Sequence, residues 1–229
     1  MTTYYRVDGW KLTYAEYLRM APDPFSFLIA AVRKFIGFPV RFGFAIPRPD
    51  RLFIVDFAEL PDVAASAMRP LVHKARAMGL RLGFYHRLAI PEPHRIGAAA
   101  ALLDGAEWTC LYVIFGKDGE QRQVQMTCAS RFADDSLAVT TTMPETMEPV
   151  PRSHIERYPG ADPPTLYARH QEHLERLASR GLVPLRIDPD RLADFVLEWE
   201  LRYLDFHIGR GVFVPMSDAE LDQLCGRRW

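Results

Sequence analysis

The chain has 229 residues, of which 48% are hydrophobic, 12% aromatic and 25% charged. This balance is typical of a folded globular protein and excludes an intrinsically disordered chain, a collagen-like repeat and a mini-protein held together by disulfides. The formal net charge of -1 provides no overall field that would concentrate nucleic acid at the surface, so we expect no nucleic-acid partner.

Cysteine usage and targeting signals indicate the compartment. The three cysteines, Cys110, Cys128 and Cys225, form no Cys-x-x-Cys pair, which argues against a zinc knuckle or a disulfide framework. No stretch approaches the roughly 20 apolar residues of a membrane-spanning helix, and the first ten residues lack the apolar core of a signal peptide. We therefore expect a cytoplasmic protein that folds as a single α+β domain over residues 1–229.

Two helices are predicted within residues 13–37. Residues 13–16 (TYAE) match a capping box, and Asp23 followed by Pro24 is a second helix start. Apolar side chains then recur at helical spacing until Gly37. They are Phe25, Leu28, Ile29, Val32, Phe35 and Ile36. We expect this stripe to pack against the protein core, although with Arg33 and Lys34 beside it the helix at 24–36 would also suit a membrane surface.

Residues 51–87 predict a β-α-β unit. The segment 52–57 (LFIVDF) has the apolar, β-branched composition of a buried strand, 61–78 has helical spacing with Pro70 inside it, and 80–87 (LRLGFYHR) is a second strand. If the two strands are parallel, the crossover between them is right-handed.

An antiparallel meander is predicted next. Residues 96–103 (IGAAAALL) are Ala-rich and predict a helix, and three strands follow at 108–115, 121–132 and 137–142. The segments GKDG and ADDS between those strands are tight-turn signals. Together with the β-α-β unit, the meander predicts a mixed, mainly antiparallel sheet of about five strands.

The last third of the chain predicts a loop and two long helices. Residues 143–162 hold four prolines and are expected to form a surface loop, while Asp-Pro pairs start helices at 163–180 and 189–208. We expect these helices and the one at 61–78 to cover one face of the sheet. The helix at 189–208 has two apolar rows, which favours a position between the sheet and a neighbouring helix or subunit, so a homodimer is one candidate assembly.

The most metal-like spacing is His170 and His173, at i and i+3 on a predicted helix. No third ligand follows at a recognisable spacing, and His170 lies on the apolar side of its helix. We therefore interpret His170 as a packing histidine and predict no metal and no cofactor.

The best candidate for a ligand site is the end of the strand at 80–87. Tyr85, His86 and Arg87 leave the sheet there, and His94 follows in the next loop. An imidazole beside a guanidinium suits an anionic or hydrogen-bonding ligand. We predict that a small anionic molecule, if one binds, contacts these four residues.

Known catalytic and nucleotide-binding motifs are missing from the sequence. It contains no G-x-x-x-x-G-K-[ST], G-x-G-x-x-G, G-x-S-x-G or H-E-x-x-H segment. The leading hypothesis is a non-catalytic binding or interaction module for a small anionic molecule or a protein partner. One alternative is a cofactor-independent enzyme in which His86 acts as acid or base, alone or with the thiol of Cys110 or Cys128. A second alternative is a peripheral membrane protein attached through the helix at 24–36; no catalytic residue is assigned.

Overall fold

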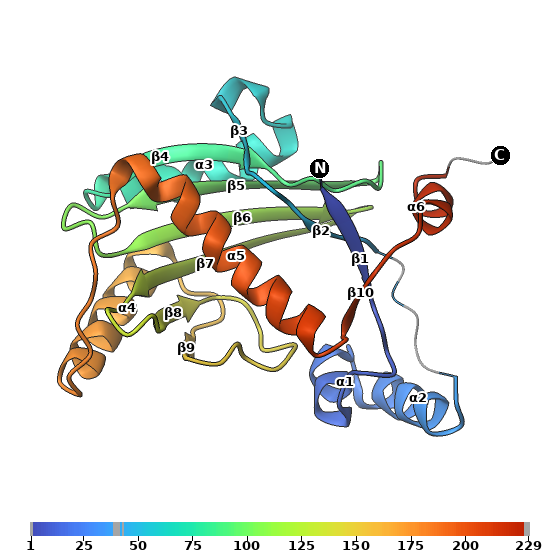
Figure 1. Ribbon diagram of the computed structural model, residues 1–229. Coiled ribbons are helices and arrows are strands. Elements are labelled where there is room, and N and C mark those ends of the chain that lie inside the picture. Colours follow the sequence, from blue (N-terminus) through green and yellow to red (C-terminus); the bar gives the residue numbers. More distant parts are fainter. Residues whose placement is uncertain (1, 39–41, 43, 227–229) are drawn as a thin grey trace.

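The computed structural model describes residues 2–38, 42 and 44–226, and it confirms an α+β domain (Figure 1). Within this part of the chain there are six α-helices, a seven-stranded mixed, mainly antiparallel sheet and a three-stranded antiparallel sheet. The prediction of about five strands in one sheet was therefore too low.

The large sheet has its strands in the order β3-β4-β5-β6-β7-β8-β9. All neighbours are antiparallel except β8 and β9, which are parallel. The predicted meander is confirmed as β6, β7 and β8. The strands are β3 (Phe53–Val55), β4 (Arg81–Arg87), β5 (Arg95–Leu103), β6 (Cys110–Asp118), β7 (Gln121–Arg131), β8 (Leu137–Thr141) and β9 (Ser153–Arg157).

The β-α-β unit lacks the parallel strands for which a right-handed crossover was predicted. Strand β3 pairs with β4 in the antiparallel direction, with Phe53 opposite Arg87 and Val55 opposite Tyr85. A short 3₁₀ turn, Phe57–Glu59, and helix α3 (Asp62–Ala77) connect the two strands. The strand-helix-strand pattern carries no information on strand direction, which depends on where the helix returns the chain to the sheet.

The predicted helix at 96–103 is wrong, because these residues belong to β5. Alanine has the highest intrinsic helix propensity, but tertiary context overrides propensity in a central strand. Ala98 and Ala100 lie in the core cluster beneath α3, whereas Ala99 and Ala101 lie in the cluster beneath the last long helix. The small side chains allow helices on both faces to approach this strand closely.

Helices cover both faces of the large sheet, not one face as predicted. Helices α3 and α4 (Pro163–Ala178) pack on one face, and α5 (Leu192–Gly209) crosses the other (Figure 1). Leu192, Phe195 and Val196 of α5 fill the core on their face. The second apolar row of α5 reaches a separate core cluster through Leu204.

The remaining elements form a second assembly beside one end of α5 (Figure 1). Its sheet has the order β10-β1-β2, with every pair antiparallel. The elements are β1 (Thr3–Val7), α1 (Tyr14–Met20), α2 (Pro24–Phe35), β2 (Ile46–Arg48), β10 (Phe213–Pro215) and α6 (Asp218–Leu224). The sequence predicted α1 and α2 but not β1, β2 or β10, and it missed β9 inside the loop expected at 143–162.

Helix α1 begins at the predicted capping box. The backbone N–H of Glu16 donates to Thr13 Oγ1 (3.1 Å), and the N–H of Thr13 donates to Glu16 Oε2 (2.7 Å). Glu16 also receives two hydrogen bonds from Arg210 at the end of α5. This ion pair fixes the α1–α2 unit, defined as residues 13–36, to the rest of the protein.

Candidate functional site

The four residues predicted to bind a ligand lie on different surfaces. Tyr85 faces α3, where its ring lies 5.3 Å from that of Phe57, whereas the neighbouring His86 faces α5 and is buried. Arg87 is exposed at the end of β4, and His94 Nε2 lies 3.5 Å from a carboxylate oxygen of Asp118. The structure does not bring the four side chains together, and ligand binding by any of them stays a prediction.

His86 belongs to a buried hydrogen-bonded chain beneath α5. Its Nε2 bonds the hydroxyl of Tyr112, and that hydroxyl donates to Glu200 Oε1 at 2.6 Å. Because the Tyr112 proton goes to Glu200, the phenol oxygen accepts from an Nε2–H of a neutral imidazole. Burial lowers the pKa of His86 to about 4 and raises the pKa of Glu200. These groups satisfy one another inside the protein.

The two buried thiols are poor nucleophiles. Burial raises the pKa of Cys110 to about 12 and also raises the pKa of Cys128 well above its ordinary value. Thiolate chemistry requires the deprotonated form, which such environments disfavour. Cys128 also lies in the core on the α3 face of the sheet, opposite His86.

His170 is buried, as interpreted from the sequence. Its Nε2 lies 2.9 Å from Ser130 Oγ and its Nδ1 lies 2.9 Å from Thr140 Oγ1. Burial and the nearby His173 lower the pKa of His170 to about 3, so the ring is neutral. Within the described ranges, no three His, Cys, Asp or Glu side chains are placed to hold a metal ion together.

The apolar stripe of α2 faces solvent, so the prediction that it packs into the core is wrong. The six residues Phe25, Leu28, Ile29, Val32, Phe35 and Ile36 are between 45% and 84% exposed. At 100° per residue they fall within an arc of about 120° on one side of the helix. We call these six residues the α2 apolar face.

Helix α2 attaches to the protein through its other side. Ala30 is buried and Phe27 packs against the same core cluster, which also contains Leu12 of the preceding loop. Lys34 Nζ donates to the carbonyl oxygen of Leu12 and lies 5.3 Å from the ring centroid of Tyr17. The side of the helix opposite the apolar arc thus supplies the packing and a polar anchor, which leaves the apolar arc uncovered.

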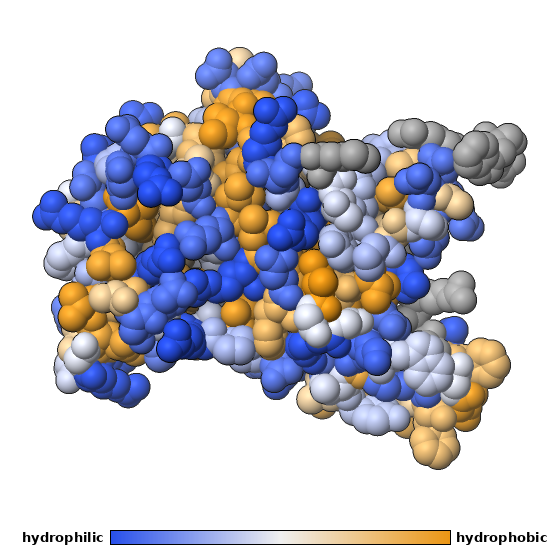
Figure 2. All heavy atoms as spheres, in the orientation of Figure 1, coloured by the Kyte–Doolittle hydropathy of each residue, from blue (hydrophilic) through white to orange (hydrophobic). Residues whose placement is uncertain are grey.

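Apolar side chains are exposed at the lower right of Figure 2, where the α1–α2 unit lies. Each side chain of this size has about 150 Å² or more of surface, and the six are between 45% and 84% exposed, so together they expose on the order of 600 Å². Monomeric proteins rarely expose so large an apolar patch without a function for it. Further exposed apolar side chains nearby in the sequence are Trp10, Tyr14, Leu18 and Phe38.

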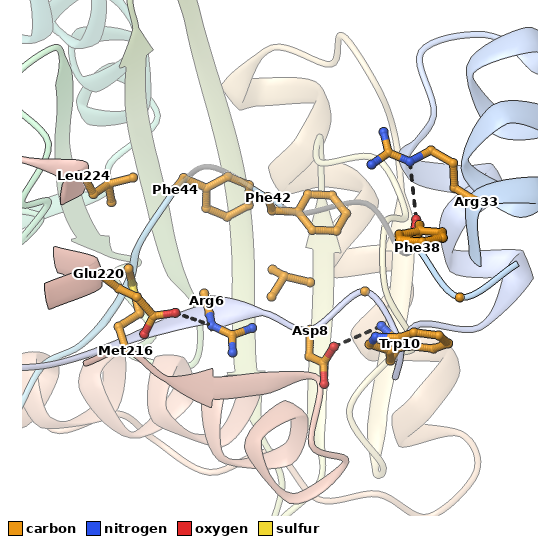
Figure 3. A pocket seen from close by; sticks show the side chains of 13 residues that line it. Arg6, Asp8, Trp10, Arg33, Phe38, Phe42, Phe44, Met216, Glu220 and Leu224 are labelled. Atoms are coloured by element: carbon orange, nitrogen blue, oxygen red, sulfur yellow. Dashed lines mark hydrogen bonds and ion pairs between the residues drawn. The ribbon is translucent and has the colours of Figure 1, made fainter. Parts of the chain in front are cut away.

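A cavity of about 960 Å³ lies beside the carboxyl end of α2 (Figure 3). It is lined by β1 and the residues that follow it, by the end of α2, and by α6 together with the residue that follows β10. The aromatic lining residues are Trp10, Phe38, Phe42 and Phe44, and the charged ones are Arg6, Asp8, Arg33 and Glu220. Sequence reasoning missed this cavity because its walls come from three segments far apart in the chain, with no local motif.

Helix α2 is 12 residues long, and no described helix is long and apolar enough to cross a bilayer.

A scan against protein-family models finds no match to the chain, and searches of curated proteins and of solved structures find none either.

Proposed function

We propose that this protein is an interaction module that attaches to the surface of a phospholipid bilayer through α2. The observation that carries the proposal is the α2 apolar face, which is exposed while the opposite side of the same helix is docked on the protein. Transfer of each such side chain from water into a bilayer would be favourable by roughly 1.5 to 3 kcal/mol of free energy.

The shape and composition of this surface favour a bilayer. The α1–α2 unit lies at the lower right of the molecule, at the end opposite α4 (Figure 1). No acidic or basic side chain lies within the apolar arc, and Arg33 borders it. Trp10 and Tyr14, both exposed, are residue types that settle at the boundary between headgroups and acyl chains.

A second copy of the chain is a weaker candidate for the occupant. Two α2 apolar faces in contact would bury on the order of 600 Å² per copy, which is less than the roughly 800 Å² per partner of a standard stable interface. A bilayer has no such requirement, because each inserted side chain contributes independently to partitioning.

The ligand hypotheses from the sequence have less support than this attachment. A small anionic ligand at His86 would have to reach an imidazole that is 1% exposed. The enzyme hypothesis requires a reacting atom near the same ring, whose Nε2 already bonds Tyr112. Both hypotheses remain predictions.

The test is co-sedimentation with phosphatidylcholine vesicles. The double variant Leu28→Ser, Phe35→Ser removes two exposed side chains, so its vesicle affinity should fall at least about tenfold while its thermal unfolding temperature stays unchanged. Val183→Ser is the matched control, because Val183 is 61% exposed and lies outside the α1–α2 unit.

Two outcomes would overturn the proposal. One is wild-type protein that does not bind vesicles at any lipid concentration tested, and the other is a double variant that binds as tightly as the wild type. Sedimentation velocity without lipid identifies the competing occupant. A wild-type dimer that the double variant converts to a monomer would assign the α2 apolar face to a second copy of the chain.

A further inference from the structure

The cavity beside α2 adjoins the surface that we propose to contact lipid. Arg33, Gly37 and Phe38 line it, and Phe35 and Ile36 of the α2 apolar face lie between Arg33 and Gly37 in the chain. A group bound in the cavity would therefore lie close to a membrane docked on α2. The volume of about 960 Å³ is at the upper end of the range for small-molecule sites and leaves room for a lipid headgroup with its glycerol.

Among the charged lining residues that the structure describes, one cation and one anion form no ion pair. Arg6 Nε lies 3.0 Å from Glu220 Oε1, so these two side chains neutralise each other (Figure 3). Arg33 Nε donates to the carbonyl oxygen of Phe38 at 3.3 Å, and Asp8 Oδ1 accepts from the backbone N–H of Trp10 at 3.0 Å. No ion pair within 4.0 Å joins Arg33 or Asp8 to another described side chain, and Asp8 acts on Lys34 only by longer-range attraction.

The aromatic residues of the cavity suit an organic cation. Phe42 and Phe44 lie edge to face with their centroids 6.1 Å apart, and Trp10 and Phe38 are on the opposite side of Asp8 from Glu220 (Figure 3). The guanidinium of Arg95 already lies 5.3 Å from the ring centroid of Phe44, which shows that a cation is accommodated on a ring of this cluster. Aromatic clusters with a carboxylate nearby are a common way to bind quaternary ammonium groups.

We infer that this cavity binds a phosphocholine group, with its phosphate at Arg33 and its quaternary ammonium against Asp8 and the aromatic residues. The inference rests on the proposed function, because it names the headgroup that the membrane-facing site takes. A zwitterion offers an anion to Arg33 and a cation to Asp8, and the cavity volume accommodates it. Asp8 would repel a purely anionic headgroup, and a purely cationic ligand would give Arg33 no anion to pair with.

The test uses dihexanoylphosphatidylcholine below its micelle-forming concentration, so that no bilayer is present. Isothermal titration calorimetry should show saturable binding at one site by the wild-type protein. Arg33→Gln removes the phosphate partner and should weaken binding about tenfold or more. Asp8→Asn keeps the acceptor for Trp10 and should weaken binding of this lipid while strengthening that of dihexanoylphosphatidylglycerol, whose headgroup is anionic.

Two further arms identify the recognised chemistry. The matched control is Arg19→Gln, because Arg19 pairs with Glu145 at 3.0 Å outside the cavity, and it should bind like the wild type. Free phosphocholine that binds as tightly as the lipid would support the site and show that its source is a soluble molecule. Inorganic phosphate that binds equally well, or equal lipid affinity of the wild type, Arg33→Gln and Asp8→Asn, would overturn the inference.

The Leu28→Ser, Phe35→Ser variant separates this inference from the proposed function. It should lose vesicle binding yet keep the affinity for monomeric phosphatidylcholine, because neither side chain lines the cavity. Wild-type protein that binds vesicles but not the monomeric lipid would make the cavity inference wrong and leave the attachment intact. Wild-type protein that binds the monomeric lipid but not vesicles would contradict the membrane attachment and support phosphocholine binding in the cavity.

Discussion

Glu16 and Arg210 are 194 residues apart in the chain and form a two-pronged ion pair. Arg210 Nη1 lies 2.7 Å from Glu16 Oε1, and Arg210 Nη2 lies 3.0 Å from Glu16 Oε2. The backbone N–H of Glu148 also donates to Glu16 Oε1 at 3.0 Å. The carboxylate thus joins α1, the end of α5 and the loop before β9, and it determines where the α1–α2 unit sits.

Removing the guanidinium should destabilise the fold. In Arg210→Met the Glu16 carboxylate stays buried without its cation, which costs about 3 kcal/mol or more and lowers the thermal unfolding temperature by roughly 6 to 12 °C. Arg48→Met is the control, because the exposed pair of Arg48 with Asp205 contributes less than about 1 kcal/mol. Equal unfolding temperatures for the two variants would contradict this role of Arg210.

The same pair predicts an acid-dependent stability. Burial alone would raise the pKa of Glu16, but hydrogen bonds from Arg210 and from two backbone N–H groups outweigh it and lower the pKa to about 2. A carboxyl with a depressed pKa in the folded state stabilises the protein above its unfolded pKa of about 4.5 and loses that contribution as pH falls towards 2. Urea unfolding of the wild type and Glu16→Gln should therefore differ by a constant amount above about pH 5 and converge between pH 4.5 and 2. A difference that does not change with pH would refute the assignment.

Buried neutral histidines add a second pH dependence at higher pH. Burial lowers the pKa of His86 to about 4, and burial together with His173 lowers the pKa of His170 to about 3. The unfolded chain takes up protons near pH 6.5 while the folded chain does not, so stability should fall as pH drops below 6.5. Each histidine contributes at most about 1.4 kcal/mol per pH unit, and His170→Gln should reduce the slope of unfolding free energy against pH between 6 and 4. An unchanged slope would mean that His170 is protonated in the folded protein.

Helix starts were predictable because their chemistry is local. The capping box at Thr13 and the side-chain caps at Asp23 and Asp162 each bond a backbone N–H three residues ahead. A few adjacent residues contain all that such a cap requires. The starts of α1, α2 and α4 therefore agree with the sequence.

Short edge strands and the cavity were not predictable, because their partners are distant in the chain. Tyr5 of β1 pairs with Pro215 of β10, and three-residue strands carry too little periodicity to be recognised. The cavity likewise joins Arg6, Arg33 and Glu220 from three segments. For a related reason the four residues of the predicted site do not lie together, since alternation along β4 directs Tyr85 and His86 to opposite faces.

Two glycines directly opposite each other in the sheet allow a matched test of packing around β5. Gly97 pairs with Gly116 of β6. A Cβ added to Gly97 would lie 2.8 Å from Leu88 Cβ, whereas one added to Gly116 meets no atom within 4 Å. Gly97→Ala should therefore lose about 1 to 3 kcal/mol of unfolding free energy, and Gly116→Ala should be neutral or slightly stabilising. Chemical denaturation measures both, and equal effects would show that the chain near Leu88 moves aside freely.

The sequence predicts the wrong orientation of α2, because the stripe is not the only side of this helix that can pack against the core. Phe27 and Ala30, outside the stripe, are also apolar, and with the anchor provided by Lys34 they suffice to dock the helix. A helix with apolar residues on two sides does not reveal from its sequence which side faces the core.

Two substitutions on opposite sides of α2 test this orientation directly. Ala30 is 8% exposed, so Ala30→Asp buries an unpaired carboxylate and should lower the unfolding free energy by several kcal/mol. Val32 is 49% exposed, so Val32→Asp should shift stability by no more than about 0.5 kcal/mol and instead weaken vesicle binding. Thermal unfolding and vesicle co-sedimentation, measured on both variants, give opposite rankings if α2 lies as described. A Val32→Asp variant that unfolds as easily as Ala30→Asp would place the stripe in the core and remove the basis for membrane attachment.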